Sequence, residues 1–191
     1  FPLVNKKSAA PIIVSSDDFK VVSIAANDLA ADVERVTGKK PLLKNSLQDL
    51  KTPSVVVGTL GKSPLIDQLV AAGKLDASGL HNAWESFLIT TVENPQPGLP
   101  KILVIVGSDR RGTAFGIYEL SQAIGVSPWY WWADVPVKQR AQLYIDKTLD
   151  IVEIPKVKYR GIFLNDEAPA LTGWVTEKYG NYNHKFYENV F

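Results

Sequence analysis

Short β-branched runs alternate with stretches of helical periodicity over the first 125 residues, and this alternation limits the chain to folds that layer helices on a sheet. Runs typical of buried strands lie at 12–14, 54–57 and 101–106. Apolar residues four apart predict a helix that follows Ser15–Asp18, which supply N-cap candidates, and ends at Gly38. We therefore expect one α/β layer domain with a mixed sheet and packed helices.

Weaker signals complete the expected layer. A short strand is predicted at 42–43, and a longer one from Glu85 to Val92. Pro64 suits the first position of a helix. The run 94–98 (Asn-Pro-Gln-Pro-Gly) predicts a turn between two strands. A further helix is expected over 112–124, before Gly125 and Pro128.

Charge and composition exclude several classes of function. Lys+Arg 21 against Asp+Glu 20 leaves a net charge of +1, so we expect no nucleic-acid partner. No apolar run approaches the roughly 20 residues that span a bilayer. Without cysteine, and with two histidines, the chain offers no thiol chemistry and no Cys-built zinc site. Neither a metal nor a cofactor is expected.

Two glycine-containing loops do not fit nucleotide-binding motifs. Gly58–Ser63 ends in Gly-Lys-Ser, but Val56 stands where a P-loop needs its first glycine, so a plain strand-to-helix turn is favoured. Gly107–Gly112 lacks the spacing of a dinucleotide site, and Ser108 or Asp109 can cap the helix that follows. Gly112 and Gly116 predict a close approach of that helix to a strand. Arg110 and Arg111 either pair with local carboxylates or hold an anion.

An aromatic block follows the last helix of the layer. Trp129-Tyr130-Trp131-Trp132 is too bulky for an ordinary solvated loop. One interpretation is a packing plug between domains. The other is a platform whose ring faces bind a flat ligand such as a sugar. Both remain open at the level of the sequence.

The end of the chain carries the densest set of chemical groups. Residues 157–164 predict a strand, and Asn165-Asp166-Glu167 follow at its carboxyl tip, where barrel enzymes place site residues. Adjacent strand residues point to opposite faces, so Asp166 and Glu167 share a pocket only if the strand has ended, and Pro169 favours that ending. The alternative role for Asp166 is to cap a loop. We expect Trp174, with Asn183 and His184, near the same mouth, although a histidine at a helix start or on the surface is the commoner case.

Three segments carry a resemblance to known enzymes. Residues 104–120 resemble N-terminal domains that precede barrels in several glycoside hydrolases. Residues 125–136 (Gly-Val-Ser-Pro-Trp-Tyr-Trp-Trp-Ala-Asp-Val-Pro) and 159–167 (Tyr-Arg-Gly-Ile-Phe-Leu-Asn-Asp-Glu) are similar to glycoside hydrolase family 115. Members of this family are α-glucuronidases that act on xylan.

The resemblance implies an accessory domain at 1–154 and, at 155–191, the first strand and loop of a catalytic (β/α)₈ barrel that is otherwise missing. The implied reaction is hydrolysis of α-1,2 links between (4-O-methyl)glucuronic acid and xylan, with inversion. Asp166 is the implied catalytic carboxylate, its partner lying outside this chain. The family pattern maps onto Asn165, Asp166 and Glu167, which are implied to bind substrate. Trp174 is expected to bind substrate from its place near the same mouth, and Arg110 is a local candidate for the uronate carboxylate.

Several further expectations follow. A barrel needs about 250 residues, so the chain alone should be inactive. The tail after Val157 is expected to pack poorly alone or to dock on the aromatic block. The resemblance, with a chain that opens at Phe1-Pro2, implies a periplasmic or secreted protein and allows a homodimer of the full-length enzyme. The alternative function is a stand-alone carbohydrate-binding or interaction module.

Overall fold

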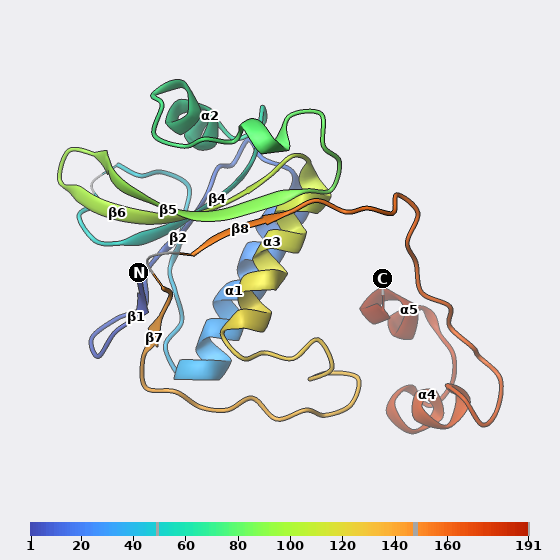
Figure 1. Cartoon of the computed structure of the whole chain (residues 1–191). Coiled ribbons are helices and arrows are strands. Elements are labelled where there is room, and N and C mark those ends of the chain that lie inside the picture. The colour runs from blue at the N-terminus through green and yellow to red at the C-terminus, as the bar shows by residue number, and fades with distance from the viewer. Residues whose placement is uncertain (49, 147–148, 191) are drawn as a thin grey trace. The chain divides into compact units, whose positions relative to one another are not determined.

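The computed structural model describes residues 1–48, 50–146 and 149–190. Their contacts divide the chain into two compact units, Phe1–Pro155 and Lys156–Phe191. In the first unit, helices cover both faces of a central sheet (Figure 1). The second unit contains a pair of short helices. Each unit is described by itself.

The sheet of the first unit is mixed, as the sequence predicts. Within the described residues its strand order is β3-β2-β4-β6-β5-β8. β2, β3, β4 and β6 run parallel, whereas β5 runs antiparallel to β6 and to β8. The strands are β2 (Ile12–Val14), β3 (Leu43–Lys44), β4 (Ser54–Thr59), β5 (Phe87–Gln96), β6 (Leu99–Gly107) and β8 (Asp150–Glu153). A separate ribbon pairs β1 (Pro2–Val4) with β7 (Leu143–Tyr144).

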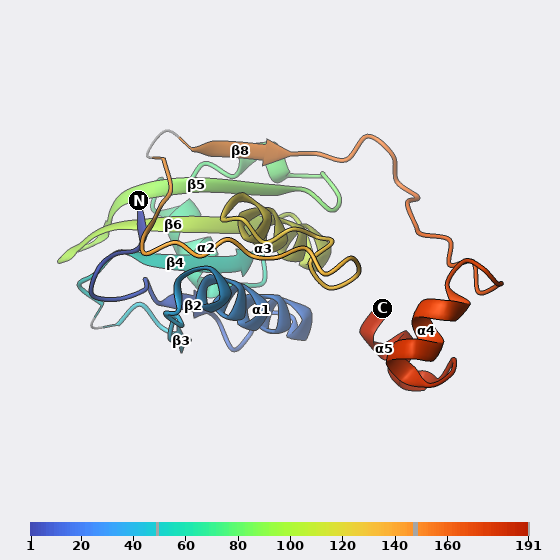
Figure 2. The same cartoon turned by 90° about the horizontal axis from the view of Figure 1, so that it is seen from below.

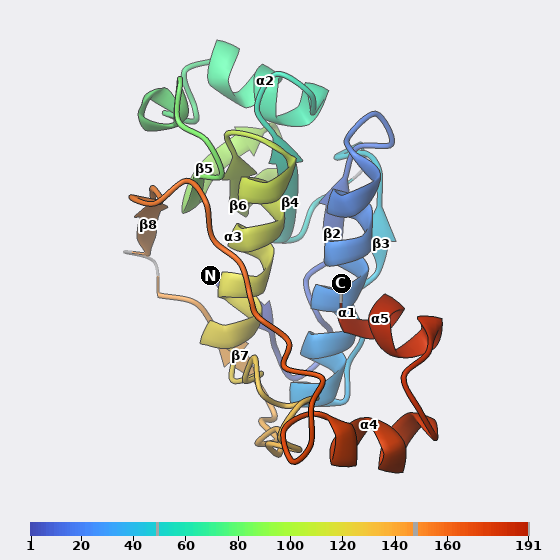
Figure 3. The ribbon, with the colours of Figure 1, turned by 90° about the vertical axis from the view of Figure 1, so that its right-hand side faces the viewer.

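Two apolar cores lie on opposite sides of this sheet. Helices α1 (Lys20–Thr37) and α3 (Arg110–Ala123) pack side by side over one face (Figures 2 and 3). Helix α2 (Pro64–Ala71) and the short 3₁₀ helix η1 (Ser78–Leu80) cover the other. Alternate residues of a strand point to opposite faces, so β4 supplies Val55 and Val57 to the first core and Val56 to the second.

The ends of α1 confirm one expectation and correct another. Gly38 has φ +70°, and its N–H donates to the carbonyl oxygen of Glu34 at 2.7 Å, as expected for a left-handed C-cap. The expected N-cap among Ser15–Asp18 is wrong, because Phe19 holds that position without a side-chain cap. Asp18 accepts instead from the N–H groups of Phe19 (2.7 Å) and Thr59 (2.8 Å), which ties the end of β2 to the end of β4.

The turn between β5 and β6 is shorter than the sequence suggests. β5 continues to Gln96, which pairs with Leu99, so that only Pro97 and Gly98 form the connection. The strand accommodates Asn94, at φ +47°, through a shift of register between Glu93 and Gln96. Asn94, which the sequence places in a turn, therefore lies within a long strand at a local irregularity of its pairing.

One carboxyl group is buried between α1 and the elements packed on it. The Asp32 residue is 5% exposed, and its carboxylate pairs with Arg35 one turn later. Burial raises the pKa of Asp32, and the neighbouring Arg35 offsets this only in part. The ionised form is therefore less favourable in the folded state than in the unfolded chain.

We expect Asp32→Asn to be as stable as the wild type or more stable at pH 7. A raised folded-state pKa means that the folded state holds its proton longer, so wild-type stability falls as pH rises from about 3.9 through the folded pKa. Asp32→Asn removes this decline. Urea unfolding from pH 4 to 8 checks the prediction. A variant that loses stability against the wild type as pH rises would contradict it.

The strand predicted at 157–164 is not observed in the second unit. These residues form no regular element, and Tyr159, Ile162 and Phe163 are 86%, 69% and 90% exposed. A strand needs a hydrogen-bonded neighbour, and the described residues after Lys156 contain no other strand. The beginning of a barrel is therefore not observed.

A helical pair closes the second unit. Helices α4 (Thr172–Tyr179) and α5 (His184–Val190) bury Val175 and Phe186 completely. Aromatic rings surround Phe186, with Trp174, Tyr179 and Tyr182 at centroid distances of 6.3, 5.7 and 5.6 Å. Across the described residues, no helix is both long and apolar enough to cross a membrane.

Candidate functional site

The loop Asn165–Glu167 is held by its backbone. The carbonyl oxygen of Asp166 accepts from the hydroxyls of Thr172 at 2.8 Å and Tyr182 at 3.0 Å. The side-chain oxygen of Asn165 accepts from the N–H of Glu167 at 3.2 Å. The loop is thereby fixed to the start of α4 and to the segment before α5.

The carboxyl groups of this loop are not used for folding. Asp166 and Glu167 are exposed, and neither side chain has an ion pair or hydrogen bond to another described residue. The loop-capping role considered for Asp166 is not observed, since its backbone carbonyl rather than its carboxylate stabilises the loop. The side chain remains available to a ligand.

The other residues expected at this mouth serve the helical pair. Trp174 is half-buried, contacts Phe186 and Tyr179, and carries the Lys178 ammonium 5.5 Å from its ring centroid. The side-chain oxygen of Asn183 accepts from the N–H of Phe186 at 3.1 Å. His184 is exposed at the first position of α5, which is the commoner situation for a lone histidine. Packing thus explains Trp174 and Asn183 without a ligand.

The aromatic block is anchored on one side and exposed on the other. The guanidinium of Arg35 lies 4.8 Å from the ring centroid of Tyr130, and the rings of Trp131 and Trp132 meet edge to face at 4.6 Å. Trp131 and Trp132 are half-buried, whereas Trp129 is 63% exposed. Within the first unit the block therefore combines packing with an accessible indole.

The loops at the carboxyl ends of the parallel strands confirm that the two glycine motifs are structural. Pro64 begins α2 directly after the Gly58–Ser63 turn, and a Cβ at Gly58 would lie 2.5 Å from the Ser63 hydroxyl oxygen. The carboxylate of Asp109 caps α3 by accepting from the N–H groups of Arg111 and Gly112, both at 2.9 Å. A tight turn and a capped helix account for both loops.

The two arginines at the start of α3 have separate surroundings. Arg111 pairs with Glu85 at 2.9 Å, one of the two outcomes the sequence left open. The guanidinium of Arg110 lies 6.0 Å from the ring centroid of Phe19, and the Lys62 ammonium lies 5.6 Å from the same centroid. Among the described residues, no three of His, Cys, Asp and Glu gather as a metal site would require.

Comparison with known proteins places these features in a family. A family model described as Glycosyl hydrolase family 67 N-terminus matches residues 3–120, and one described as Glycosyl hydrolase family 115 matches residues 153–191. A solved structure of the family 115 4-O-methyl-α-glucuronidase BtGH115A, reported with specificity for decorated arabinogalactans, is similar with a TM-score of 0.73 and 33% identity. The similarity covers 93% of this chain and 22% of that one.

The chain belongs to glycoside hydrolase family 115. It corresponds to the N-terminal portion, and residues 3–120 belong to the domain type named for the N-terminus of family 67. No curated protein matches the chain. A structure of CpGH84D is similar over 60% of this chain and 17% of that one, with a TM-score of 0.40 and 8% identity.

Two expectations from the sequence are thereby confirmed. The family assignment made from residues 125–136 and 159–167 is supported, and so is the mixed α/β architecture of the N-terminal portion. The family 115 match over 153–191 includes Asn165–Glu167. The boundary between an accessory domain and a barrel, and the roles of the individual site residues, stay predictions.

Proposed function

We propose that the protein containing this chain releases (4-O-methyl)glucuronic acid from a plant polysaccharide by hydrolysing its α-1,2 link. The observation that carries the proposal is the 33% identity with a family 115 4-O-methyl-α-glucuronidase over 93% of this chain. The chain spans 22% of that relative, so the proposed activity belongs to a longer protein. By itself the chain is expected to be inactive, because a complete barrel needs about 250 residues.

The proposed chemistry uses two carboxyl groups with inversion at the anomeric carbon. One carboxylic acid protonates the leaving oxygen while a carboxylate activates water on the opposite face, with the two groups roughly 6.5–9.5 Å apart. Asp166 is the local candidate, since its carboxylate is exposed and its loop is held by backbone contacts. Asn165 and Glu167, beside it, are proposed to contact sugar hydroxyls. The partner carboxylate belongs to the remainder of the barrel.

Two plant polymers are candidate substrates of the longer protein. The sequence resemblance favours glucuronoxylan, whereas the similar solved enzyme is reported with specificity for decorated arabinogalactans. Incubation of the longer protein with each polymer, followed by quantification of free uronic acid, tests the activity and distinguishes the two. Release from either polymer supports the proposal. Absence of uronic acid from both would reject it.

A second candidate function rests on the exposed indole of Trp129 beside Trp131 and Trp132. These rings would act as a carbohydrate-binding platform in a module without catalysis. Calorimetric titration of the chain with glucuronoxylan oligosaccharides tests it, with Trp131→Ala/Trp132→Ala as the comparison. Binding that the double variant abolishes supports the module, and the absence of binding supports an accessory domain.

A periplasmic or secreted location and a homodimer of the full-length enzyme complete the proposal.

A further inference from the structure

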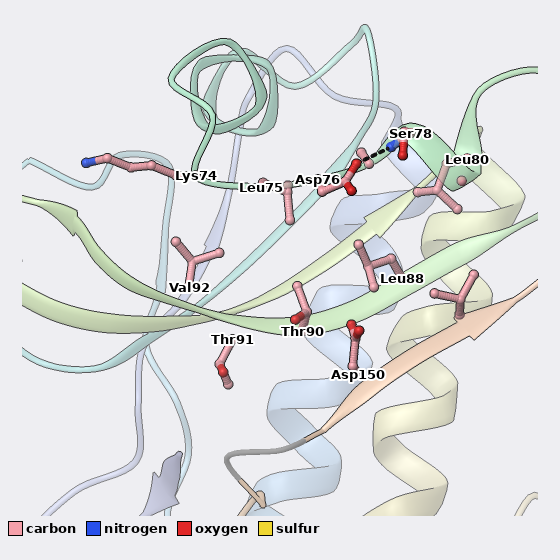
Figure 4. A pocket seen from close by; sticks show the side chains of 13 residues that line it. Lys74, Leu75, Asp76, Ser78, Leu80, Leu88, Thr90, Thr91, Val92 and Asp150 are labelled. Atoms are coloured by element: carbon pink, nitrogen blue, oxygen red, sulfur yellow. Dashed lines mark hydrogen bonds between the residues drawn. The ribbon is translucent and has the colours of Figure 1, made fainter.

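A pocket of about 290 Å³ lies between the segment Lys74–Leu80 and the sheet formed by β5 and β8 (Figure 4). This volume is near the lower end of the range for small-ligand sites, and it suits a single sugar ring better than a large cofactor. The pocket lies entirely within the first unit, and none of the candidate site residues predicted from the sequence lines it.

The walls of the pocket are aliphatic. Leu75 and Leu80 contribute from the segment above the sheet, and Leu88 and Val92 from β5; all four are at most 5% exposed. Val152 of β8 is 51% exposed and borders the opening. Walls of this kind accept the C–H faces of a ligand.

The polar groups of the pocket are mainly hydrogen-bond acceptors. Thr90 and Asp150 are register partners on adjacent strands, so their side chains share one face of the sheet, on which Leu88 and Val92 also lie. Asp76 lines the pocket from the segment above (Figure 4). Hydrogen bonds from the side chain and backbone of Ser78 lower the pKa of Asp76, so it is ionised at neutral pH.

The charges of the lining residues disfavour an anionic occupant. Lys74 is the cation among the lining residues, and its ammonium donates to the carbonyl oxygens of Asn94 at 3.0 Å and Pro95 at 2.8 Å. The carboxylate of Asp150 has no ion pair or hydrogen bond to another described side chain. Two carboxylates and a threonine hydroxyl therefore face the cavity, while the ammonium of Lys74 is turned away from them and held by backbone carbonyl oxygens (Figure 4).

We propose that this pocket binds a neutral pyranose ring. Asp150, Thr90 and Asp76 accept hydrogen bonds from the hydroxyl groups of the ring, and the aliphatic walls contact its C–H face. The preference for a sugar over other neutral polyols rests on the proposed function. The site would hold a backbone sugar of the polysaccharide, separately from the uronate that the enzyme cleaves.

The test is binding by the 191-residue chain, without catalysis. Titrations of the ¹⁵N-labelled chain with xylohexaose, a galacto-oligosaccharide and glucuronic acid are followed by NMR. We expect a neutral oligosaccharide to shift the amides of Asp76, Leu88 and Thr90, and glucuronic acid to leave them unchanged. Asp150→Ala should weaken binding about tenfold, as loss of a hydrogen bond to a charged group implies.

Glu153→Ala is the matched control, since Glu153 is exposed on the same strand but pairs with Phe87 and does not line the pocket. It should bind as the wild type does. Absence of binding by both neutral oligosaccharides, or equal weakening by the two variants, would overturn the proposal. If the longer enzyme is active but the 191-residue chain binds no neutral sugar, the sugar-binding role of the pocket is rejected and the proposed function is not. Binding by the chain with an inactive enzyme would reject the proposed function alone.

Discussion

Gly112→Ala is expected to lower the free energy of unfolding of the first unit by about 3 kcal/mol or more. A Cβ at Gly112 would lie 2.8 Å from the backbone nitrogen and 2.9 Å from the carbonyl carbon of Ser86, and closer still to its carbonyl oxygen. Because all three of these neighbours are backbone atoms, no flexible side chain can move aside to make room for the Cβ. The same Ser86 carbonyl oxygen accepts from the N–H of Ser108 at 2.8 Å, and the Ser108 hydroxyl accepts from the N–H of Ser86 at 3.0 Å.

Urea unfolding followed by circular dichroism measures this loss. Gly79→Ala is the matched control, because a Cβ at Gly79 meets nothing within 4 Å and the residue does not have a positive φ. It should differ from the wild type by less than about 0.5 kcal/mol. If Gly112→Ala is as stable as this control, the close packing of α3 against the start of β5 is not what requires the glycine.

Asp166→Asn in the longer enzyme is expected to reduce kcat by a factor of about 10²–10⁴. The variant keeps the size of the side chain and the backbone contacts to Thr172 and Tyr182, so the loop should fold as in the wild type. What it removes is the charge and the proton-transfer capacity of one carboxyl group.

Glu177→Gln provides the control, since Glu177 is an exposed carboxylate on α4 of the same unit. Its kcat should match that of the wild type. Thermal unfolding of both variants should show unchanged stability. If Asp166→Asn retains full activity, Asp166 is not the pocket carboxylate, and the acid and base both lie elsewhere in the barrel.

Local patterns in the sequence predict those elements whose signals lie within a few residues of each other. The period of four in α1 with Gly38 at its end, and the β-branched run of β6, each specify an element from within. Gly112 and Gly116 also predict a close approach correctly, since a Cβ at Gly116 would lie 2.8 Å from Ile105. A glycine in a helix is costly unless such packing compensates.

Features that depend on contacts between residues distant in the sequence are not predicted by local patterns. The strand predicted at 157–164 has the right residues but no strand to pair with among the described residues of its unit. Conversely, β8 was not expected, and it forms because β5 offers an edge that pairs Thr90 with Asp150. The pocket beside it joins residues 60 positions apart, and no local motif marks it. Asp166 is indicated by its place at the tip of the expected strand and by the family resemblance of its neighbours, and its role stays a prediction.

The most direct test of the proposed function is a time-resolved ¹H NMR assay of the longer enzyme on an oligosaccharide carrying one α-1,2-linked 4-O-methylglucuronic acid. We expect the free uronic acid to appear first as the β-anomer and then to mutarotate, because water attacks the face opposite the leaving group. First appearance of the α-anomer would contradict the inverting mechanism. If no uronic acid is released from this substrate, the proposal that the chain is part of an α-glucuronidase is wrong.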